Sequence, residues 1–242
     1  MHGPDVHPLE LSDIRAILLD IEGTTTPIAF VQQVLFPYAR ARVRDYLEQH
    51  ADDPGVRADV ALLRDEFDAE STHSPDLPAW NPEAYVYWLM DRDRKSTGLK
   101  ALQGRIWEAG YRAGEVKGKG EVYDDVRPAL TRWRKAGKEI AIFSSGSVQA
   151  QRNLFANTTD GDLSPFLSGY FDTTTGPKRE ASSYQRIATA LRREPREVLF
   201  VSDVTAELDA ARAAGMRTAL CVRDSGVSAS DHPRIQSFAE LV

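Results

Sequence analysis

The sequence predicts an α/β fold: a Rossmann-like parallel sheet core with a helical domain inserted after its first strand. Two observations lead to this expectation. Short apolar runs alternate with helical patterns in the second half of the chain, and a long helix-rich segment separates the first apolar run from the second. Strand–helix–strand alternation implies parallel strands joined by right-handed crossovers.

Four short apolar runs are typical of buried strands in a parallel sheet. The first is "RAILLD", and "EIAIFSS", "EVLFVSD" and "RTALCV" follow later in the chain. These runs cover residues 15–20, 139–145, 197–203 and 217–222. Before the second run, we expect Asp125 to be the N-cap of a helix that stops at Gly137.

The segment between the first two strands is much longer than a crossover needs, and it is rich in helix signals. Asn81 followed by Pro82, for example, is typical of a capped helix start. We therefore expect residues 1–28 and 121–242 to form the sheet domain, and residues 29–120 to form an inserted helical cap.

The cap is expected to contain a helix kinked at Pro37, and the glycine-rich stretch 115–125 is expected to lead back to the sheet. Ligands of open α/β sheets bind at the C-terminal ends of the strands, so an insertion there can act as a lid. Four aromatic residues could line a pocket of the cap, although we favour a place for most of them in its core. They are Trp80, Tyr85, Tyr87 and Trp88.

Composition narrows the possible functions. The net charge of −6 argues against a nucleic-acid partner, because phosphate backbones are bound by clustered Lys and Arg. The single cysteine excludes an intramolecular disulfide and fits a reducing cytoplasm. No apolar stretch approaches the roughly 20 residues of a membrane span, and the first residues lack the pattern of a signal peptide.

Polar residues that can carry chemistry stand at the ends of the predicted strands. Asp20 ends the first strand, Ser144 and Ser145 end the second, and Asp203 ends a later one; Lys178 opens the helix before that later strand. Each residue alone is more typical of a turn or a helix cap. A parallel sheet brings these ends together, so their coincidence favours a functional site.

Such a set of side chains suits phosphate chemistry. Asp20 and Asp203 offer the oxygen ligands that Mg²⁺ prefers, and the cation together with Lys178 would neutralise a phosphate dianion. The serines and the N-terminus of the following helix would bind its remaining oxygens. Asp20 would then be the nucleophile toward phosphorus, and Glu22 would act as general acid and base.

Four segments of the chain resemble the motifs of a known superfamily. "DIEGTTT", "SSGS", "GPK" and "SDVTAELDA" occur in the order of the four motifs of the haloacid dehalogenase-like phosphohydrolases. The usual first motif is Asp-x-Asp-Gly-Thr, and this sequence departs from it at Glu22. With that departure, the segments closely resemble the enolase-phosphatase family, which is also called acireductone synthase.

The resemblance implies an enzyme of methionine salvage, a pathway of methionine biosynthesis. Such enzymes convert 2,3-diketo-5-methylthiopentyl-1-phosphate to its enol form and then, with loss of phosphate, to 1,2-dihydroxy-3-keto-5-methylthiopentene. Carried over by motif, Asp20 is the nucleophile and a ligand of one Mg²⁺ per subunit. Glu22 matches the acid–base position, whose main-chain carbonyl also reaches the metal, and Asp203 is the remaining ligand. The resemblance also favours a monomer.

The remaining motif residues are implied to bind the substrate phosphate. Ser144 and Ser145 hold its oxygens, Lys178 pairs with phosphate and nucleophile, and Thr24 supports the site or serves the turn alone. Glu207, four positions after Asp203, is expected to be a solvated helix acid rather than a group that orients a metal-bound water. The base for enolisation stays open between Glu22 and a residue of the cap.

Other readings share part of this pattern. A sugar-phosphate phosphatase or phosphomutase of the same superfamily would keep Asp20, Ser144, Lys178 and Asp203, whereas a 2-haloacid dehalogenase needs neither a metal nor an acid at Glu22. A non-catalytic relative that binds a partner is disfavoured, because the set of catalytic positions is complete. A nucleotide-binding Rossmann domain is excluded, since no Gly-x-Gly-x-x-Gly turn follows the first strand.

Overall fold

The structure, a computed structural model, describes residues 9–94, 96–116, 121–223 and 230–242. The chain divides into two compact units. The first comprises Met1–Phe30 and Gly118–Val242, and the second comprises Val31–Lys117. Part of the expected return linker, residues 117–120, lies outside the described residues. The assignment of the two units as catalytic core and cap stays a prediction.

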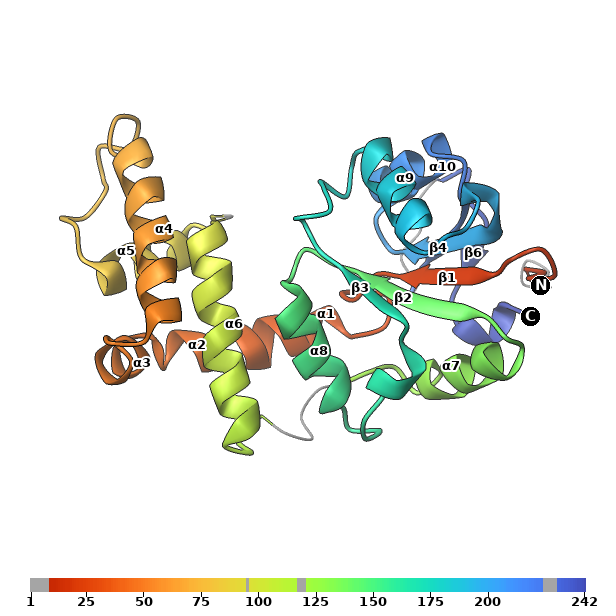
Figure 1. Cartoon of the computed structure of the whole chain (residues 1–242), viewed down its shortest axis with the longest axis horizontal. Coiled ribbons are helices and arrows are strands. Elements are labelled where there is room, and N and C mark those ends of the chain that lie inside the picture. Colours follow the sequence, from red (N-terminus) through yellow and green to blue (C-terminus); the bar gives the residue numbers. More distant parts are fainter. Residues whose placement is uncertain (1–8, 95, 117–120, 224–229) are drawn as a thin grey trace, which may run out of the picture. The chain divides into compact units, whose positions relative to one another are not determined.

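The first unit is built on a six-stranded sheet in the order β3-β2-β1-β4-β5-β6, and every neighbouring pair is parallel (Figure 1). The predicted α/β fold class is therefore confirmed. The strands are β1 (Ala16–Leu19), β2 (Glu139–Phe143), β3 (Gly169–Phe171), β4 (Val198–Ser202), β5 (Arg217–Cys221) and β6 (Arg234–Ile235). The four apolar runs became β1, β2, β4 and β5. The edge strands β3 and β6 were not predicted, because each is too short to produce an apolar run.

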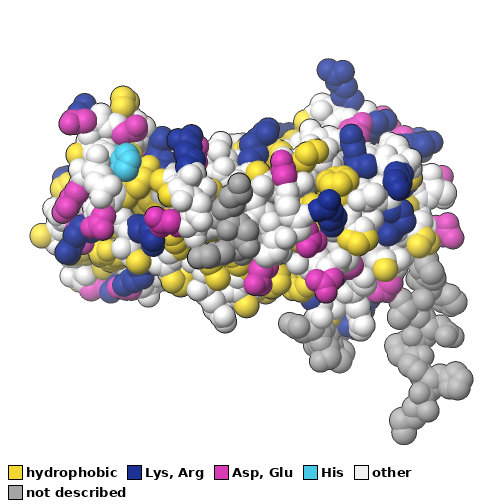
Figure 2. Space-filling view, turned by 90° about the horizontal axis from the view of Figure 1, so that it is seen from below, with side chains coloured by type: hydrophobic (Ala, Val, Ile, Leu, Met, Phe, Trp, Pro, Cys, Tyr) yellow, Lys and Arg dark blue, Asp and Glu magenta, His cyan; other side chains and the backbone are white. Residues whose placement is uncertain are grey.

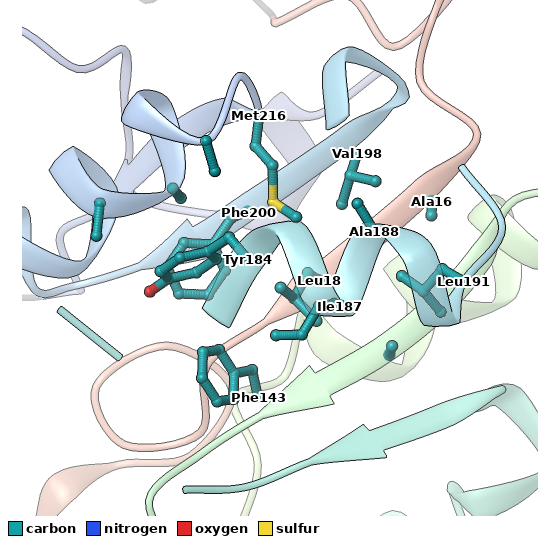
Figure 3. Close-up of a cluster of buried hydrophobic side chains, with 14 of the residues drawn as sticks. Ala16, Leu18, Phe143, Tyr184, Ile187, Ala188, Leu191, Val198, Phe200 and Met216 are labelled. Carbon is teal, nitrogen blue, oxygen red and sulfur yellow. The ribbon is translucent and has the colours of Figure 1, made fainter. Parts of the chain in front are cut away.

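Helices cover both faces of this sheet (Figure 1). They are α7 (Val126–Lys135), α8 (Val148–Ala156), α9 (Ala181–Ala190) and α10 (Thr205–Ala213), with short 3₁₀ turns η2 (Ser164–Phe166), η3 (Pro195–Glu197) and η4 (Phe238–Glu240). Alternate strand residues point to opposite faces. On one face, Leu18 and Phe200 join Tyr184 and Ile187 of α9 and Leu208 of α10 in a single buried cluster (Figure 3).

The central position of β1 explains why it is apolar throughout. It lies between β2 and β4, and its four side chains have no exposed surface. Leu19 pairs with Ile142 on one side and Val201 on the other. The next residue, Asp20, therefore leaves the sheet between the C-terminal ends of two neighbouring strands, about 4.8 Å from each.

The second unit consists of helices over its described residues. A π-helical turn η1 (Val31–Leu35) follows α1 (Ile28–Phe30) of the first unit, and the further helices are α2 (Phe36–Arg40), α3 (Val43–Gln49), α4 (Pro54–Glu70), α5 (Pro82–Asp91) and α6 (Thr97–Arg112). At the kink expected for Pro37, the structure has the π-helical turn η1 followed by α2, with Pro37 in the first turn of α2, where its missing N–H leaves the carbonyl four residues earlier without the usual helical donor. Asn81 caps α5 as predicted, and its side chain accepts a hydrogen bond from the Ala84 N–H.

The four aromatic residues considered for a pocket mainly form the core of the second unit, as expected from the sequence. Tyr85 and Trp88 are buried, and the Tyr85 ring centroid lies 5.2 Å from that of Phe67 and 5.8 Å from that of Trp88. Trp80 and Tyr87 pack against the same cluster and are partly buried. Tyr87 also borders a surface hollow of about 380 Å³, whose other lining residues are Pro37, Arg40 and Ala41.

The surface carries charges of both signs. On the face displayed in Figure 2, basic and acidic side chains are interspersed, and no broad basic area covers it. Within the described part of the chain, no helix combines the length and apolarity that a membrane crossing requires.

Candidate active site

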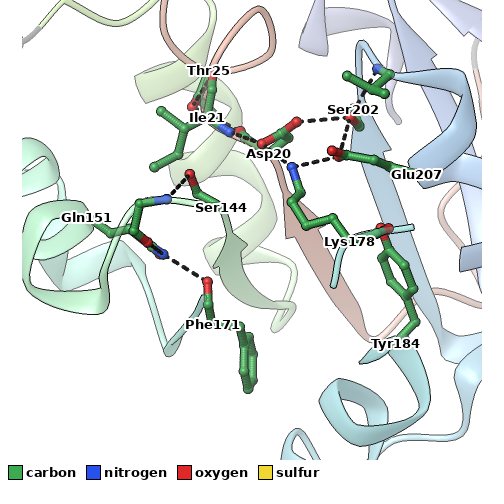
Figure 4. Close-up of polar contacts among 12 residues, drawn as sticks. Asp20, Ile21, Thr25, Ser144, Gln151, Phe171, Lys178, Tyr184, Ser202 and Glu207 are labelled. Atoms are coloured by element: carbon green, nitrogen blue, oxygen red, sulfur yellow. Dashed lines mark hydrogen bonds and ion pairs between the residues drawn. The ribbon is translucent and has the colours of Figure 1, made fainter. Parts of the chain in front are cut away.

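Asp20 is held rigidly at the end of β1. Its side chain is 7% exposed, and its N–H donates to the Val201 carbonyl of the neighbouring strand at 3.0 Å. Its Oδ1 accepts a 2.7 Å hydrogen bond from the N–H of Ile21, and its Oδ2 accepts one of 2.9 Å from the Ser202 hydroxyl. The carboxylate is thus oriented by groups of two adjacent strand ends, as Figure 4 shows.

The residues after Asp20 form a tight turn. The hydroxyl of Thr25 donates to the Asp20 carbonyl at 3.1 Å, and the N–H of Gly23 donates to the Thr26 carbonyl at 2.8 Å. Gly23 has a φ of +69°, a conformation that costs a residue with a side chain about 1–2 kcal/mol. A Cβ atom at this position would lie 2.7 Å from the Asp203 Cγ, so only glycine lets the turn approach that carboxylate.

The ammonium group of Lys178 joins two carboxylates (Figure 4). Its Nζ lies 2.7 Å from Asp20 Oδ1 and 2.6 Å from Glu207 Oε2, and the lysine side chain is 10% exposed. Burial by itself favours the neutral amine, but the attraction of Asp20 and Glu207 outweighs it and raises the pKa of Lys178. Lys178 is therefore a fixed positive charge beside Asp20.

Hydrogen bonds from α9 hold the backbone that carries Lys178. The Tyr184 hydroxyl donates to the Lys178 carbonyl at 2.6 Å, and the Ser183 hydroxyl donates to the Pro177 carbonyl at 2.7 Å. Lys178 lies in the loop before α9 rather than in its first turn, which corrects the sequence prediction. The loop can pack this closely on α9 because Gly176 has no side chain to meet Ser183.

Two residues of the site were not assigned to it from the sequence. Ser202, the last residue of β4, places its hydroxyl 2.9 Å from Asp20 Oδ2 and 3.2 Å from Glu207 Oε2. The expectation that Glu207 is solvated is wrong, because its side chain is 12% exposed and contacts Lys178. Burial and the nearby charge of Asp20 raise the pKa of Glu207 to about 7, against the opposing effect of Lys178.

Asp203 brings a second carboxylate to the same turn. Burial, followed by the negative charge of Asp20, raises the pKa of Asp203 to about 6, and Glu22 adds to the effect. Asp20 and Asp203 thus form a partly buried pair of carboxylates that repel one another. Their oxygen atoms are the ligands that a hard divalent cation such as Mg²⁺ prefers. Among the described residues, no three His, Cys, Asp or Glu side chains form a set that could hold a metal. Any such cation therefore needs a main-chain oxygen or water besides these carboxylates.

The "SSGS" segment forms a loop between β2 and α8. Ser144 is buried, and its hydroxyl accepts a 3.3 Å hydrogen bond from the Gly146 N–H, whereas Ser145 is exposed. Gln151 of α8 donates to the carbonyls of Gly146 and Phe171, each at 2.8 Å, and so ties the loop to the end of β3 (Figure 4). Because β2 is the neighbour of β1, this loop follows the strand end next to that of Asp20.

The last two predicted residues lie in the turn after Asp20. Thr24 is fully buried, and within the described part of the chain its hydroxyl has no hydrogen-bond partner. The Glu22 side chain is exposed, and its backbone pairs with that of Thr26 in an isolated bridge. The structure thus gathers Asp20, Lys178 and Asp203 around this turn; the roles assigned to the site residues stay predictions.

Comparisons with known proteins agree with this geometry. The family model of the haloacid dehalogenase-like hydrolases matches residues 14–215. Enolase-phosphatase E1 of Synechococcus elongatus is 56% identical to this chain, over 97% of this chain and 100% of that protein. The chain belongs to the enolase-phosphatase family. Enolase-phosphatase E1 of Pseudomonas aeruginosa is 48% identical over 95% of this chain and 98% of its own length.

A solved structure supports the fold of this enolase-phosphatase family member. The UTR4 protein of Saccharomyces cerevisiae matches with a TM-score of 0.74 and 34% identity, over 94% of this chain and 100% of that chain. The resemblance read from the four sequence motifs is therefore confirmed at the level of family, and the chain is a phosphatase of the haloacid dehalogenase-like group.

Proposed function

We propose that this chain is the enolase-phosphatase of methionine salvage. It would convert 2,3-diketo-5-methylthiopentyl-1-phosphate to 1,2-dihydroxy-3-keto-5-methylthiopentene and phosphate. The observation that carries the proposal is the Asp20 carboxylate at the end of β1, bonded by Lys178 and Ser202 and backed by the near full-length enolase-phosphatase relatives.

In the first half of phosphate transfer, an oxygen of Asp20 attacks phosphorus while the bond from phosphorus to the substrate oxygen breaks. The leaving oxygen takes a proton from Glu22, and Asp20 becomes an aspartyl phosphate. The hydrogen bonds from Ile21 and Ser202 support this step, because they fix the direction in which the carboxylate faces before substrate binds.

In the second half, water attacks the aspartyl phosphate. Glu22, now ionised, removes a proton from that water, and the bond from phosphorus to Asp20 breaks to release inorganic phosphate. The exposure of the Glu22 side chain supports this role, since an acid–base group in this cycle must exchange its proton with substrate and water.

The phosphate dianion requires positive and hydrogen-bonding groups. Lys178 supplies a positive charge 2.7 Å from the nucleophile. The neighbouring "SSGS" loop, which leads into α8, offers the hydroxyl groups of Ser144 and Ser145 and the N–H of Ser145, whereas the N–H of Ser144 already donates to the Phe171 carbonyl. Gln151 of α8 donates to the Gly146 carbonyl of this loop, and Tyr184 of α9 donates to the Lys178 carbonyl. We therefore expect the phosphate site to be formed before the substrate arrives.

One Mg²⁺ per subunit completes the proposal. Asp20 and Asp203 would hold it with their carboxylates, and Glu22 would contribute its main-chain carbonyl. When bound, the cation neutralises charge on the phosphate and on the two aspartates. Thr24 would support the turn that carries these ligands. We also propose a monomer in the cytoplasm, and light scattering of the purified protein tests the first of these statements.

The deciding experiment follows both products of the reaction. With Mg²⁺ and the diketo phosphate, we expect release of inorganic phosphate together with an ultraviolet-absorbing enediol. Asp20→Asn should stop phosphate release while the protein stays folded, because the amide is not a nucleophile toward phosphorus. Phosphate release without any enol intermediate or product would leave a simple phosphatase and overturn the bifunctional proposal.

A further inference from the structure

Arg223 lies just beyond β5 and binds the turn that follows Asp20. Its side chain is 7% exposed, and its guanidinium donates two hydrogen bonds to one oxygen, the Thr24 carbonyl, from Nε at 3.0 Å and from Nη2 at 2.6 Å. Hydrogen bonds from a charged donor are about twice as strong as neutral ones. The turn is therefore anchored by a residue that is far from it in sequence and belongs to no motif.

Asp125 holds the opposite side of the same guanidinium. Its Oδ2 lies 2.6 Å from Arg223 Nη1 and also accepts hydrogen bonds from the Ser237 hydroxyl at 2.7 Å and the Phe238 N–H at 2.6 Å. Asp125 occupies the N-cap position of α7, as predicted, but its side chain makes no capping hydrogen bond. Its carboxylate orients Arg223 instead.

Two aromatic rings contact the guanidinium. The Cζ of Arg223 lies 4.2 Å from the ring centroid of Tyr123 and 4.6 Å from that of Phe238, within the range of cation–π contacts. The N–H of Tyr123 in turn donates to the Thr25 carbonyl at 3.1 Å. Arg223 and Tyr123, which contact one another, thus bind the consecutive carbonyls of Thr24 and Thr25.

We propose that Arg223 is a positioning residue for the turn that carries Asp20 and Glu22. It fixes the Thr24 carbonyl and so limits how the main chain between Asp20 and Thr26 can move. A guanidinium presents several donors in a planar fork, and here two of its nitrogens bind Thr24 while the third binds Asp125; the compact ammonium of a lysine does not reproduce this geometry. The inference rests on the proposed function, because the roles of Asp20 and Glu22 do.

Arg223 shares no contact with the groups that hold the phosphate-binding residues, which gives the proposal a kinetic signature. Lys178 and the "SSGS" loop are fixed by α9 and by Gln151, and none of the described contacts of Arg223 involves them. Loss of the Arg223 guanidinium should therefore loosen the turn that carries Asp20 and Glu22, while the groups that bind phosphate stay in place. Misplacement by about 1 Å can cost about 100-fold in rate.

The test compares Arg223→Lys with Arg223→Ala and with a matched control, Arg193→Lys. Arg193 is also partly buried and paired, with Glu139 at the start of β2, the opposite end of the strand from the site. We expect Arg223→Lys to lower kcat about 10- to 100-fold with KM changed less than about threefold, and Arg193→Lys to keep the wild-type kcat. Asp125→Asn, which leaves the bonds to Thr24 in place, should lower kcat less than Arg223→Lys.

Calorimetric titration with Mg²⁺ gives a second measurement that does not depend on turnover. Because Asp20 and the Glu22 carbonyl belong to the turn, we expect both Arg223 variants to bind Mg²⁺ more weakly than wild type. A wild-type kcat and Mg²⁺ affinity in folded Arg223→Lys would overturn the proposal. So would losses that match the unfolded fraction measured by circular dichroism, because Arg223 would then serve stability alone.

The failure of this inference is distinguishable from failure of the proposed function. Each variant is assayed with the diketo phosphate and with p-nitrophenyl phosphate, a generic ester. If wild type forms no enediol, the proposed function fails, while the kcat of Arg223→Lys on the generic ester and its Mg²⁺ affinity still decide the positioning role. If wild type hydrolyses neither ester, the Mg²⁺ titration decides it.

Discussion

The hydroxyl of Tyr184 donates a 2.6 Å hydrogen bond to the main-chain carbonyl of Lys178. Tyr184 has no exposed surface, and its ring packs against those of Phe143 and Phe200, with centroids 5.5 and 5.1 Å away. The hydrophobic core on this face of the sheet is therefore linked directly to the candidate active site. The position of the lysine that pairs with Asp20 thus depends on how one tyrosine of α9 packs against the sheet.

Tyr184→Phe should weaken both stability and catalysis. The change leaves the Lys178 carbonyl without its donor, which costs about 1–3 kcal/mol for a buried group. We also expect a lower kcat, because the loop that carries Lys178 gains freedom. Tyr170→Phe is the matched control, since the buried Tyr170 hydroxyl has no hydrogen-bond partner among the described residues. Chemical denaturation and steady-state kinetics measure the effects; equal results for the two variants would contradict the prediction.

Much of this site could be predicted from the sequence because parallel strands align their ends. The apolar runs of β1, β2 and β4 are unambiguous, and each places its following polar residue at the same edge of the sheet. Asp20 and Asp203 could therefore be assigned to one site without knowing any contact between them. The pairing of Lys178 with Asp20 came from the family resemblance and has now a geometric basis.

The residues that sequence reasoning missed act through long-range contacts. Ser202 could have been found, since it directly precedes Asp203 at the end of a strand, but serine is common in turns. The burial of Glu207 depends on the loop that carries Lys178, and nothing in the helix pattern of α10 indicates it. Asp125 has the local pattern of an N-cap, yet Arg223, 98 positions later, takes its carboxylate. Tertiary contacts overrode the local preference.

Gly23→Ala should abolish activity. The added methyl group meets the Asp203 carboxylate, and alanine at a φ of +69° is strained by about 1–2 kcal/mol. Relief requires either Asp203 or the turn to move, and both carry ligands of the proposed metal. Phosphate release and Mg²⁺ titration measure the consequence.

Gly137→Ala separates strain from the clash in that experiment. Gly137 follows α7 with a φ of +75°, and a Cβ atom there would meet nothing within 4 Å. We expect this variant to lose about 1–2 kcal/mol of stability as well, and to keep wild-type turnover. If both glycine variants stay active, the close approach of Asp203 to the turn is not required for catalysis.

The stability contributed by Asp125 should depend on pH in the acid range. Burial acts to raise its pKa, but hydrogen bonds from Arg223, Ser237 and Phe238 outweigh it and lower the pKa. The unfolded pKa is about 3.9, so the stabilisation is complete well above that pH and is lost as pH falls through the lower folded value. The difference in unfolding free energy between wild type and Asp125→Asn should be constant near neutral pH and shrink below about pH 4. Urea titrations across this range measure it; a difference that grows on acidification would refute the assignment.

Asp203→Asn should give a protein that is inactive yet more stable than metal-free wild type. Asp203 is partly buried beside Asp20, and its pKa is raised to about 6. Ionised Asp203 destabilises the folded protein. This destabilisation is absent below the pKa of the unfolded chain and complete above the pKa of the folded protein. At neutral pH the asparagine variant avoids it and is therefore more stable by about 1 kcal/mol after solvent screening.

Mg²⁺ should reverse the order of stability of wild type and Asp203→Asn. A ligand at 100 times its Kd stabilises the protein that binds it by about 2.7 kcal/mol, and the variant lacks one of the two carboxylates. Thermal unfolding with EDTA and then with excess Mg²⁺ measures both effects. Equal stabilisation of both proteins by Mg²⁺ would show that Asp203 holds no metal.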